Sequence, residues 1–156
     1  MDLFDRRTFL AGAAGAAAGL LVLPDTGAAQ ARGITMWKDP NCGCCTAWAD
    51  RMQAHFRQPV RIVPTADMPA LKRARGIPQN LWSCHTAEVQ GYVTEGHVPP
   101  ADVQRLIASR SRAIRGLAVP GMPLGSPGME AGGQRQRYQV FAFAAGGQRS
   151  VYATHG

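Results

Sequence analysis

Three of the four cysteines in this 156-residue chain lie within four positions, in the segment Cys42-Gly43-Cys44-Cys45. A short apolar run at 34–37 and a turn precede them, and a helical pattern begins after them. A strand-to-helix turn directs backbone N–H groups and the positive end of the helix dipole at any thiol placed there, which favours thiolate. The fourth cysteine, Cys84, is followed at once by His85. Four sulfurs and an adjacent imidazole predict a soft-metal site or a redox site.

Thiol–disulfide exchange is the first chemistry that this spacing supports. Cys42 and Cys45 form a C-x-x-C pair, in which an exposed thiol attacks a disulfide and a more buried thiol resolves it. Helical spacing between Cys45 and Trp48 places Cys45 toward the core. Cys44 complicates this scheme, because a third thiol would compete for the bridge. Purely structural disulfides are a further alternative, but a bridge within 42–45 closes a tiny loop and restrains little of the unfolded chain.

Metal binding is the second chemistry. Zinc sites space their thiolates as C-x(2–4)-C, so that each reaches its own vertex, whereas C-x-C-C crowds three thiolates together. Several Cu(I) ions bridged by shared thiolates fit that crowding better than a zinc-stabilised module does, because Cu(I) is soft. Cys84 and His85 complete the site if the strand that starts there lies beside the first helix. The alternative is a buried apolar thiol next to a hydrogen-bonded strand histidine.

Two methionines are further candidate copper ligands. Met122 and Met129 lie in a Pro/Gly-rich loop that offers no helical stripe to pack along, and thioethers select copper over zinc. Gap filling in the core is the alternative. His97 is predicted to cap or pack at a hairpin-to-helix junction rather than to bind metal. His55 and His155 receive no role, since they are expected at a helix end and in a frayed tail.

The first 31 residues are predicted to be a removed twin-arginine signal peptide. Arg6 and Arg7 precede an Ala/Gly-rich apolar stretch, and Ala29-Gln30-Ala31 offers a small-x-small cleavage site. The apolar stretch is shorter than the roughly 20 residues that a spanning helix needs, which disfavours the alternative of an uncleaved membrane anchor. The sequence thus predicts Tat export to the periplasm and one mature domain, 32–156.

Positive charge does not indicate a nucleic-acid partner. The chain carries 17 Lys and Arg against 10 Asp and Glu, for a formal net charge of +7. The densest basic group is on and after one predicted helix and lacks interleaved aromatic residues: Arg105, Arg110, Arg112 and Arg115. A solvated helix face is the expected reading of this group.

The order of predicted elements indicates an α/β fold of thioredoxin-like type, with a central mixed sheet, flanking helices and a C-terminal β-hairpin. The cysteine motif lies at the first strand–helix junction. Strands are expected at 34–37, 60–63, 82–89, 92–95, 138–143 and 149–152, helices at about 44–56, 68–75 and 99–109, and a long loop at 116–133.

Four ordered motifs closely resemble those of the CopG-type family of exported bacterial copper-binding proteins. They lie at 37–45, 83–87, 91–99 and 116–129, and the resemblance covers roughly 34–152. It implies a thioredoxin-like fold with a cysteine-rich site that holds several Cu(I) ions. By matching motif, the implied ligands here are Cys42, Cys44, Cys45 and Cys84, with His85 as the nitrogen ligand.

Residues and resemblance together lead to one main prediction. The chain is expected to be a periplasmic copper-binding protein for copper resistance or homeostasis, with redox coupling between cluster and disulfide as an option. Its expected partners are copper ions and other periplasmic copper-handling proteins, without nucleic acid and without stable membrane insertion after signal cleavage. The alternative is a thiol–disulfide oxidoreductase that uses Cys42 and Cys45, for which metal binding is incidental.

Overall fold

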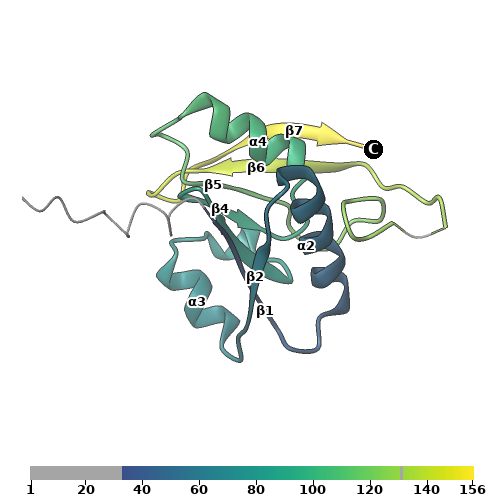
Figure 1. Cartoon of the computed structure of the whole chain (residues 1–156). Coiled ribbons are helices and arrows are strands. Elements are labelled where there is room, and N and C mark those ends of the chain that lie inside the picture. The colour runs from purple at the N-terminus through teal and green to yellow at the C-terminus, as the bar shows by residue number, and fades with distance from the viewer. Residues whose placement is uncertain (1–32, 131) are drawn as a thin grey trace, which may run out of the picture.

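The first strand, β1 (Ile34–Lys38), lies inside a seven-stranded mixed sheet with the strand order β2-β1-β3-β4-β5-β6-β7 (Figure 1). The computed structural model describes residues 33–130 and 132–156, so the predicted signal peptide lies outside the described residues. The other elements of the described chain are α2 (Gly43–Phe56), β2 (Val60–Pro64), α3 (Met68–Ala74), the 3₁₀ turn η1 (Gln79–Leu81), β3 (His85–Val89), β4 (Tyr92–Glu95), α4 (Pro100–Ser109), β5 (Gly116–Ala118), β6 (Tyr138–Phe143) and β7 (Arg149–His155).

The pairing of β1 decides where the cysteines meet. β1 runs parallel to β2 and antiparallel to β3, and its last residue, Lys38, is paired with the first residue of β3, His85. Because α2 starts a short turn after β1 ends, the start of β3 must lie beside the N-terminal end of α2. This confirms the predicted placement of Cys84 and His85 near the C-x-C-C turn.

Two cores lie on opposite faces of the sheet. The larger core contains the buried faces of α2 and α4 and the strand residues that point toward them: Met36, Trp48, Met52, Ala87, Val89, Val103, Leu106, Leu117 and Val140. The smaller core lies on the other face, under η1: Ile77, Leu81, Val93, Ala118 and Phe143. Strand alternation explains the division, since Ala87 and Val89 belong to the first core while Thr86 turns toward Lys72 of α3.

The helices begin and end as the sequence predicts. The Asp67 carboxylate accepts a hydrogen bond from Ala70 N at 2.9 Å and so caps α3. In α2 the buried residues are Cys45, Trp48, Ala49 and Met52, which confirms the predicted core-facing stripe. α2 ends at Phe56, and its C-cap residue Arg57 adopts the left-handed conformation with φ of 52°.

Three boundaries differ from the sequence prediction. Gly116–Ala118 is a fully buried strand, β5, between β4 and β6, and not the start of the long loop. β3 starts at His85 rather than at 82, because its neighbour β1 ends at Lys38, which is the residue paired with His85. The final strand continues to His155, whose ring stacks on Tyr138 and hydrogen-bonds Asp102. The predicted frayed tail is therefore wrong: a buried carboxylate holds the end of β7.

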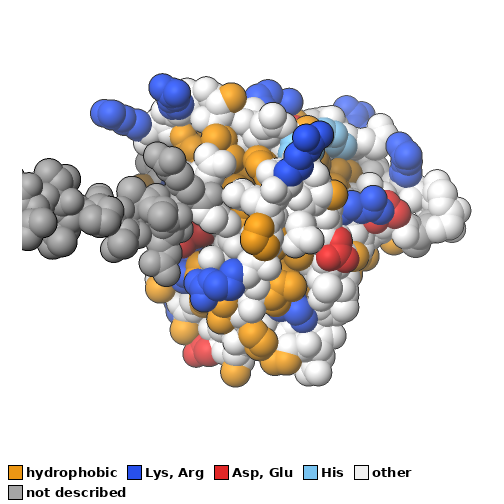
Figure 2. All heavy atoms as spheres, viewed as in Figure 1, with side chains coloured by type: hydrophobic (Ala, Val, Ile, Leu, Met, Phe, Trp, Pro, Cys, Tyr) orange, Lys and Arg blue, Asp and Glu red, His pale blue; other side chains and the backbone are white. Residues whose placement is uncertain are grey.

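Lys and Arg side chains are dispersed over the visible face among uncharged side chains, without one continuous basic patch (Figure 2). Arg105, on α4, pairs with Asp102 at 2.9 Å and lies over the Tyr152 ring at 4.7 Å. Its charge thus serves local contacts with the C-terminal strand. No helix of the described chain is long and apolar enough to cross a membrane.

Candidate metal centre

The four cysteines converge at one end of the sheet. The Sγ atoms of Cys42, Cys44, Cys45 and Cys84 all lie within 4.8 Å of one another. In this structure Cys42 and Cys45 form a disulfide, and Cys44 and Cys84 are free. Cys44 Sγ lies 3.5 Å from Cys42 Sγ. The arrangement gathers a disulfide and two thiols in one place, and sulfur donors of this kind suit soft metal ions.

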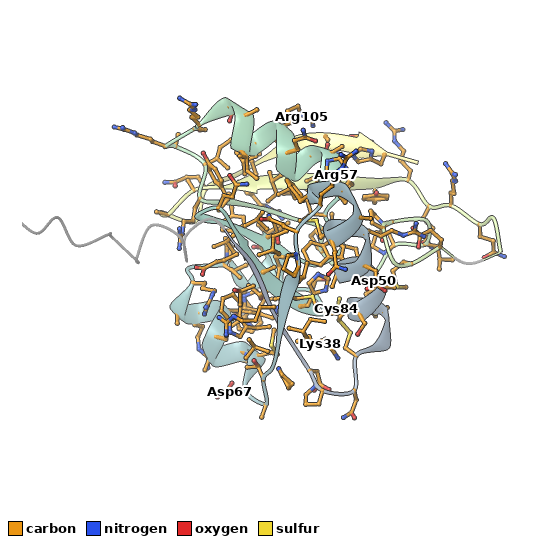
Figure 3. All side chains as sticks on the ribbon, in the orientation of Figure 1. Lys38, Asp50, Arg57, Asp67, Cys84 and Arg105 are labelled. Atoms are coloured by element: carbon orange, nitrogen blue, oxygen red, sulfur yellow. A yellow bond between two sulfur atoms is a disulfide. The ribbon has the colours of Figure 1, made fainter. Side chains whose placement is uncertain are left out.

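Lys38 organises the turn that carries the first three cysteines. Its side chain is buried, and Nζ donates to the carbonyl oxygens of Asp39, Pro40 and Cys42 at 3.0, 3.1 and 2.9 Å. Asp39 closes the turn further, because its carboxylate accepts from Asn41 N and its carbonyl from Cys42 N. Figure 3 shows Lys38 and Cys84 near one another beside the start of α2. The Lys38 ammonium group therefore fixes the backbone of the turn that precedes α2 and carries the first cysteine.

A buried ion pair on the other face of the sheet holds the segment that carries Cys84. The Glu95 carboxylate accepts from Ser83 N at 2.5 Å and from Thr86 Oγ1 at 2.6 Å, and pairs with Lys72 Nζ. Burial raises the pKa of Glu95, and the charge of Lys72 opposes that rise. Since Ser83 directly precedes Cys84, this carboxylate fixes the position of the fourth thiol.

Two imidazoles face the Cys84 thiol. Cys84 Sγ lies 3.2 Å from His85 Nδ1 and 3.1 Å from His97 Nε2, and the three residues form a second group whose ligand atoms lie within 4.8 Å. His97 Nδ1 is 2.8 Å from the Pro127 carbonyl oxygen. A carbonyl only accepts, so Nδ1 carries the proton and the Nε2 lone pair of the neutral ring points at Cys84. His97 therefore belongs to the site, a placement that the sequence prediction of a capping or packing residue did not include.

The signal that locates His97 was present in the hairpin. β3 and β4 pair Thr86 with Glu95 across the two-residue turn Gln90-Gly91. Continuing this register by two residues places Cys84 opposite His97. A two-residue turn thus fixes the partner of Cys84 from sequence alone.

Burial sets the protonation of these groups. It raises the pKa of the Cys84 thiol to about 11, with hydrogen bonding from Ser83 acting in the opposite direction. Desolvation lowers the pKa of His85 well below its ordinary range, and the neighbouring groups His97, Lys72 and Lys38 add to the effect. Burial also lowers the pKa of His97, against the hydrogen bond to Pro127. Both imidazoles are therefore neutral and competent to bind metal at neutral pH. From the sequence alone, protons are expected to compete with metal for the His85 imidazole near the usual histidine pKa of about 6.5. Burial lowers the pH at which this competition begins.

The buried histidines predict that the reduced, metal-free protein loses stability in acid. Below about pH 6.5 the unfolded chain protonates His85 while the folded chain excludes that proton, so this residue lowers the free energy of unfolding by up to about 1.4 kcal/mol per pH unit. The lowered pKa of His97 acts in the same direction. Urea unfolding at pH 7 and pH 5 measures this slope. His85→Leu should remove most of this slope, and the exposed His55→Gln should leave it unchanged. Equal slopes in the His85 variant and the wild type would contradict the assignment.

The loop that follows β5 and carries Met122 and Met129, here called the methionine loop, packs against the start of α2. A Cβ atom at Gly128, whose φ is +85°, would lie 2.7 Å from Trp48 N and 3.1 Å from the Cys44 carbonyl oxygen. Only glycine allows this close approach. Met122 is 52 % exposed and lines a pocket together with Cys84. Met129 is half-buried, and its backbone bonds to Gly125 and Ser126 within the loop. Met122 therefore lies beside the cysteine cluster, because it shares a pocket with Cys84.

The remaining histidines lie in other surroundings. His55 Nε2 is 2.5 Å from Gln104 Oε1 at the contact between α2 and α4. His155 Nε2 is 2.7 Å from the buried Asp102 carboxylate. Both positions explain these side chains through packing and hydrogen bonding.

Comparisons with known proteins identify related chains. A family model described as "Protein of unknown function, DUF411" matches residues 81–129, which contain Cys84, His85 and His97. Two solved structures, named "Copper resistance protein copG- Form 2" and "Copper resistance protein copG- Form 1", are each 42 % identical to this chain with a TM-score of 0.74. Each match covers 80 % of this chain, and 98 % and 97 % of the respective solved chains. The search of curated protein sequences found no match. The identity, extended over nearly the whole length of both solved chains, shows that this chain belongs to the CopG copper resistance protein family.

Proposed function

We propose that this protein binds Cu(I) for bacterial copper resistance, through the thiolates of Cys42, Cys44, Cys45 and Cys84. The observation that carries the proposal is the convergence of four Sγ atoms within 4.8 Å of one another. The choice of copper as the metal rests on the two relatives named copper resistance protein. Thiolates prefer soft ions, and thiolates this close together serve better as bridges between several Cu(I) ions than as separate vertices around one ion.

The disulfide state must be reduced before all four thiolates can bind. Reduction of the Cys42–Cys45 bridge takes two electrons and two protons and leaves two thiols, which lose their protons to solvent when Cu(I) binds. A dithiol reductant supplies the electron pair and becomes a disulfide. The disulfide and cluster forms are thus two states of one site, which gives the predicted redox coupling a chemical basis.

Two neutral imidazoles would complete the donor set. His85 Nδ1 and His97 Nε2 flank Cys84 Sγ from different sides, so each is placed to bind an ion held by that thiolate. Imidazole is a good copper ligand. We assign both as nitrogen ligands of the cluster. The cluster needs neither predicted thioether, because Met122 lines the neighbouring pocket and the backbone hydrogen bonds of Met129 lie within its own loop.

The predicted location and fold type follow as parts of the proposal. The twin-arginine motif supports Tat export, removal of residues 1–31 and a periplasmic mature domain, 32–156, that exchanges copper with other periplasmic copper-handling proteins. The order β2-β1-β3-β4, with α2 between the parallel strands β1 and β2, supports a thioredoxin-like core. β5, β6 and β7 then extend that core.

Anaerobic titration of the reduced mature protein with Cu(I), in competition with a strong Cu(I) chelator, tests this function. We expect a stoichiometry above one ion per chain and no displacement of copper by equimolar Zn²⁺, because thiolate clusters favour the softer ion. A single equivalent, or a preference for zinc, would contradict the cluster.

Thiol–disulfide exchange is the second candidate function, and one observation favours it. Cys42 and Cys45 are bridged across the first turn of α2, with Cys42 half-buried and Cys45 fully buried. This is the arrangement of an attacking and a resolving thiol. In that function Cys44, Cys84 and the two histidines would be dispensable.

A further inference from the structure

A pocket of about 450 Å³ opens beside the cysteine cluster. It lies between α3, the segment before β3 and the methionine loop, and Cys84 forms part of its wall. The same thiol lies within 4.8 Å of the other three cysteine sulfurs. Cys84 therefore borders both the pocket and the cluster, and an ion bound to it from the pocket is already next to the other thiolates.

Two thioethers line this pocket from separate elements. Met68 is the first residue of α3 and is only 8 % exposed, whereas Met122 is 52 % exposed on the loop that follows β5. The loop that carries Met122 is held in place by a hydrogen bond, in which Ser83 Oγ donates to the Gly121 carbonyl at 2.5 Å. This bond joins the loop to the segment that carries Cys84. An exposed methionine fixed beside a half-buried cysteine gives the pocket a soft outer donor and a soft inner donor.

The electrostatics of the pocket also suit a monovalent cation. Lys72 lines the pocket, but its ammonium group is paired with the buried Glu95 carboxylate and bonded to Thr86 Oγ1. The pair is neutral as a unit, so the pocket does not present a free positive charge toward an arriving cation. The rest of the lining is largely apolar, with Pro69 and Trp82 among its residues, and an apolar lining favours thioether-bound Cu(I) over hydrated divalent ions.

We propose that Met68 and Met122, together with Cys84, form an uptake site for a single Cu(I) ion, which passes from there to the cysteine cluster. This inference rests on the proposed function and assigns its route of loading. The transfer is ligand exchange without electron transfer: Cu(I) binds the thioethers, Cys84 loses its proton to solvent as the Cu–S bond forms, and the thioether bonds then break as thiolates of the cluster replace them.

Methyl NMR of selectively labelled methionines tests whether the uptake site exists apart from the cluster. The probe is Ag(I), a soft and redox-inert stand-in for Cu(I), added at one equivalent to oxidised Cys44→Ser protein. In this protein the Cys42–Cys45 disulfide prevents cluster formation and Cys84 is the free thiol. We expect the methyl signals of Met68 and Met122 to shift, and those of Met52 and Met129 to remain. The buried Met52 also reports that the variant is folded. Unchanged Met68 and Met122 signals would overturn the proposal.

Transfer kinetics test whether copper uses this route. We expect Met68→Leu/Met122→Leu to slow Cu(I) transfer from a chelator complex to the reduced protein by about tenfold, while final stoichiometry and affinity stay at wild-type values. Met129→Leu, in the same loop, is the matched control and should transfer at the wild-type rate. Wild-type kinetics in the double variant, with a normally loaded cluster, would refute the uptake route and leave the proposed function standing. Methionine shifts with Ag(I) in a protein that never loads several Cu(I) ions would support the pocket and reject the cluster.

Discussion

The Cys44→Ser variant is expected to lose multinuclear copper loading, falling to about one Cu(I) ion or fewer per chain. Cys44 Sγ lies 3.5 Å from Cys42 Sγ and within 4.8 Å of the sulfurs of Cys45 and Cys84. Removal of this bridging thiolate leaves no compact set of donors for several ions. The loss should match that of Cys42→Ser, as measured by anaerobic Cu(I) titration of both reduced variants.

The same variant separates copper binding from thiol exchange. If exchange were the function, Cys44→Ser would keep full activity in an insulin-reduction assay, because Cys42 and Cys45 alone form the redox pair. Thr46→Ser, an exposed neighbour on α2, is the control for local disturbance and should load copper normally. Strong reductase activity in the Cys44 variant, together with undiminished copper loading, would favour the oxidoreductase.

The second large effect is expected on stability, from Lys72→Met. Its ammonium group is buried and paired with the fully buried Glu95, and removal of one partner of such a pair costs about 3–5 kcal/mol. Burial already raises the pKa of Glu95, so without Lys72 the carboxyl takes up a proton more readily. This relief places the expected loss toward the lower end of that range. Urea unfolding of the reduced, metal-free protein at pH 7 measures it.

Two further variants show whether the ion pair is the cause. Lys72→Met/Glu95→Gln should recover much of the lost stability, because the amide keeps acceptor oxygen for Ser83 N and carries no charge. Arg73→Met, at the exposed neighbouring position on α3, should unfold within about 0.5 kcal/mol of the wild type. A loss below about 1 kcal/mol in Lys72→Met would show that the pair is not needed to hold the Cys84 segment.

The convergence of the cysteines was predictable because it depends on local patterns. The β-α-β order and the hairpin turn at Gln90-Gly91 place the start of β3 beside the start of α2. The same turn fixes Cys84 opposite His97, although the position of His97 just before a helix also predicts a capping role. The histidine was missed because capping and cross-strand contact give the same local pattern.

Other features depend on contacts that no local pattern carries. Gly116–Ala118 is only three residues long and borders a Gly/Pro-rich segment, and it becomes a strand because β4 and β6 pair with it on both sides. His155 is ordered by the distant, buried Asp102. Lys38 and Glu95 hold the cysteine segments by hydrogen bonds to backbone groups, a role that cannot be predicted from residue type alone.

X-ray absorption at the copper K edge measures whether the four clustered thiolates share several copper ions. For the reduced protein loaded anaerobically to saturation, we expect a Cu(I) edge, a first shell dominated by sulfur, and copper–copper scattering from thiolate-bridged ions. A first shell of nitrogen and oxygen, or a sulfur shell without copper–copper scattering at full loading, would contradict it.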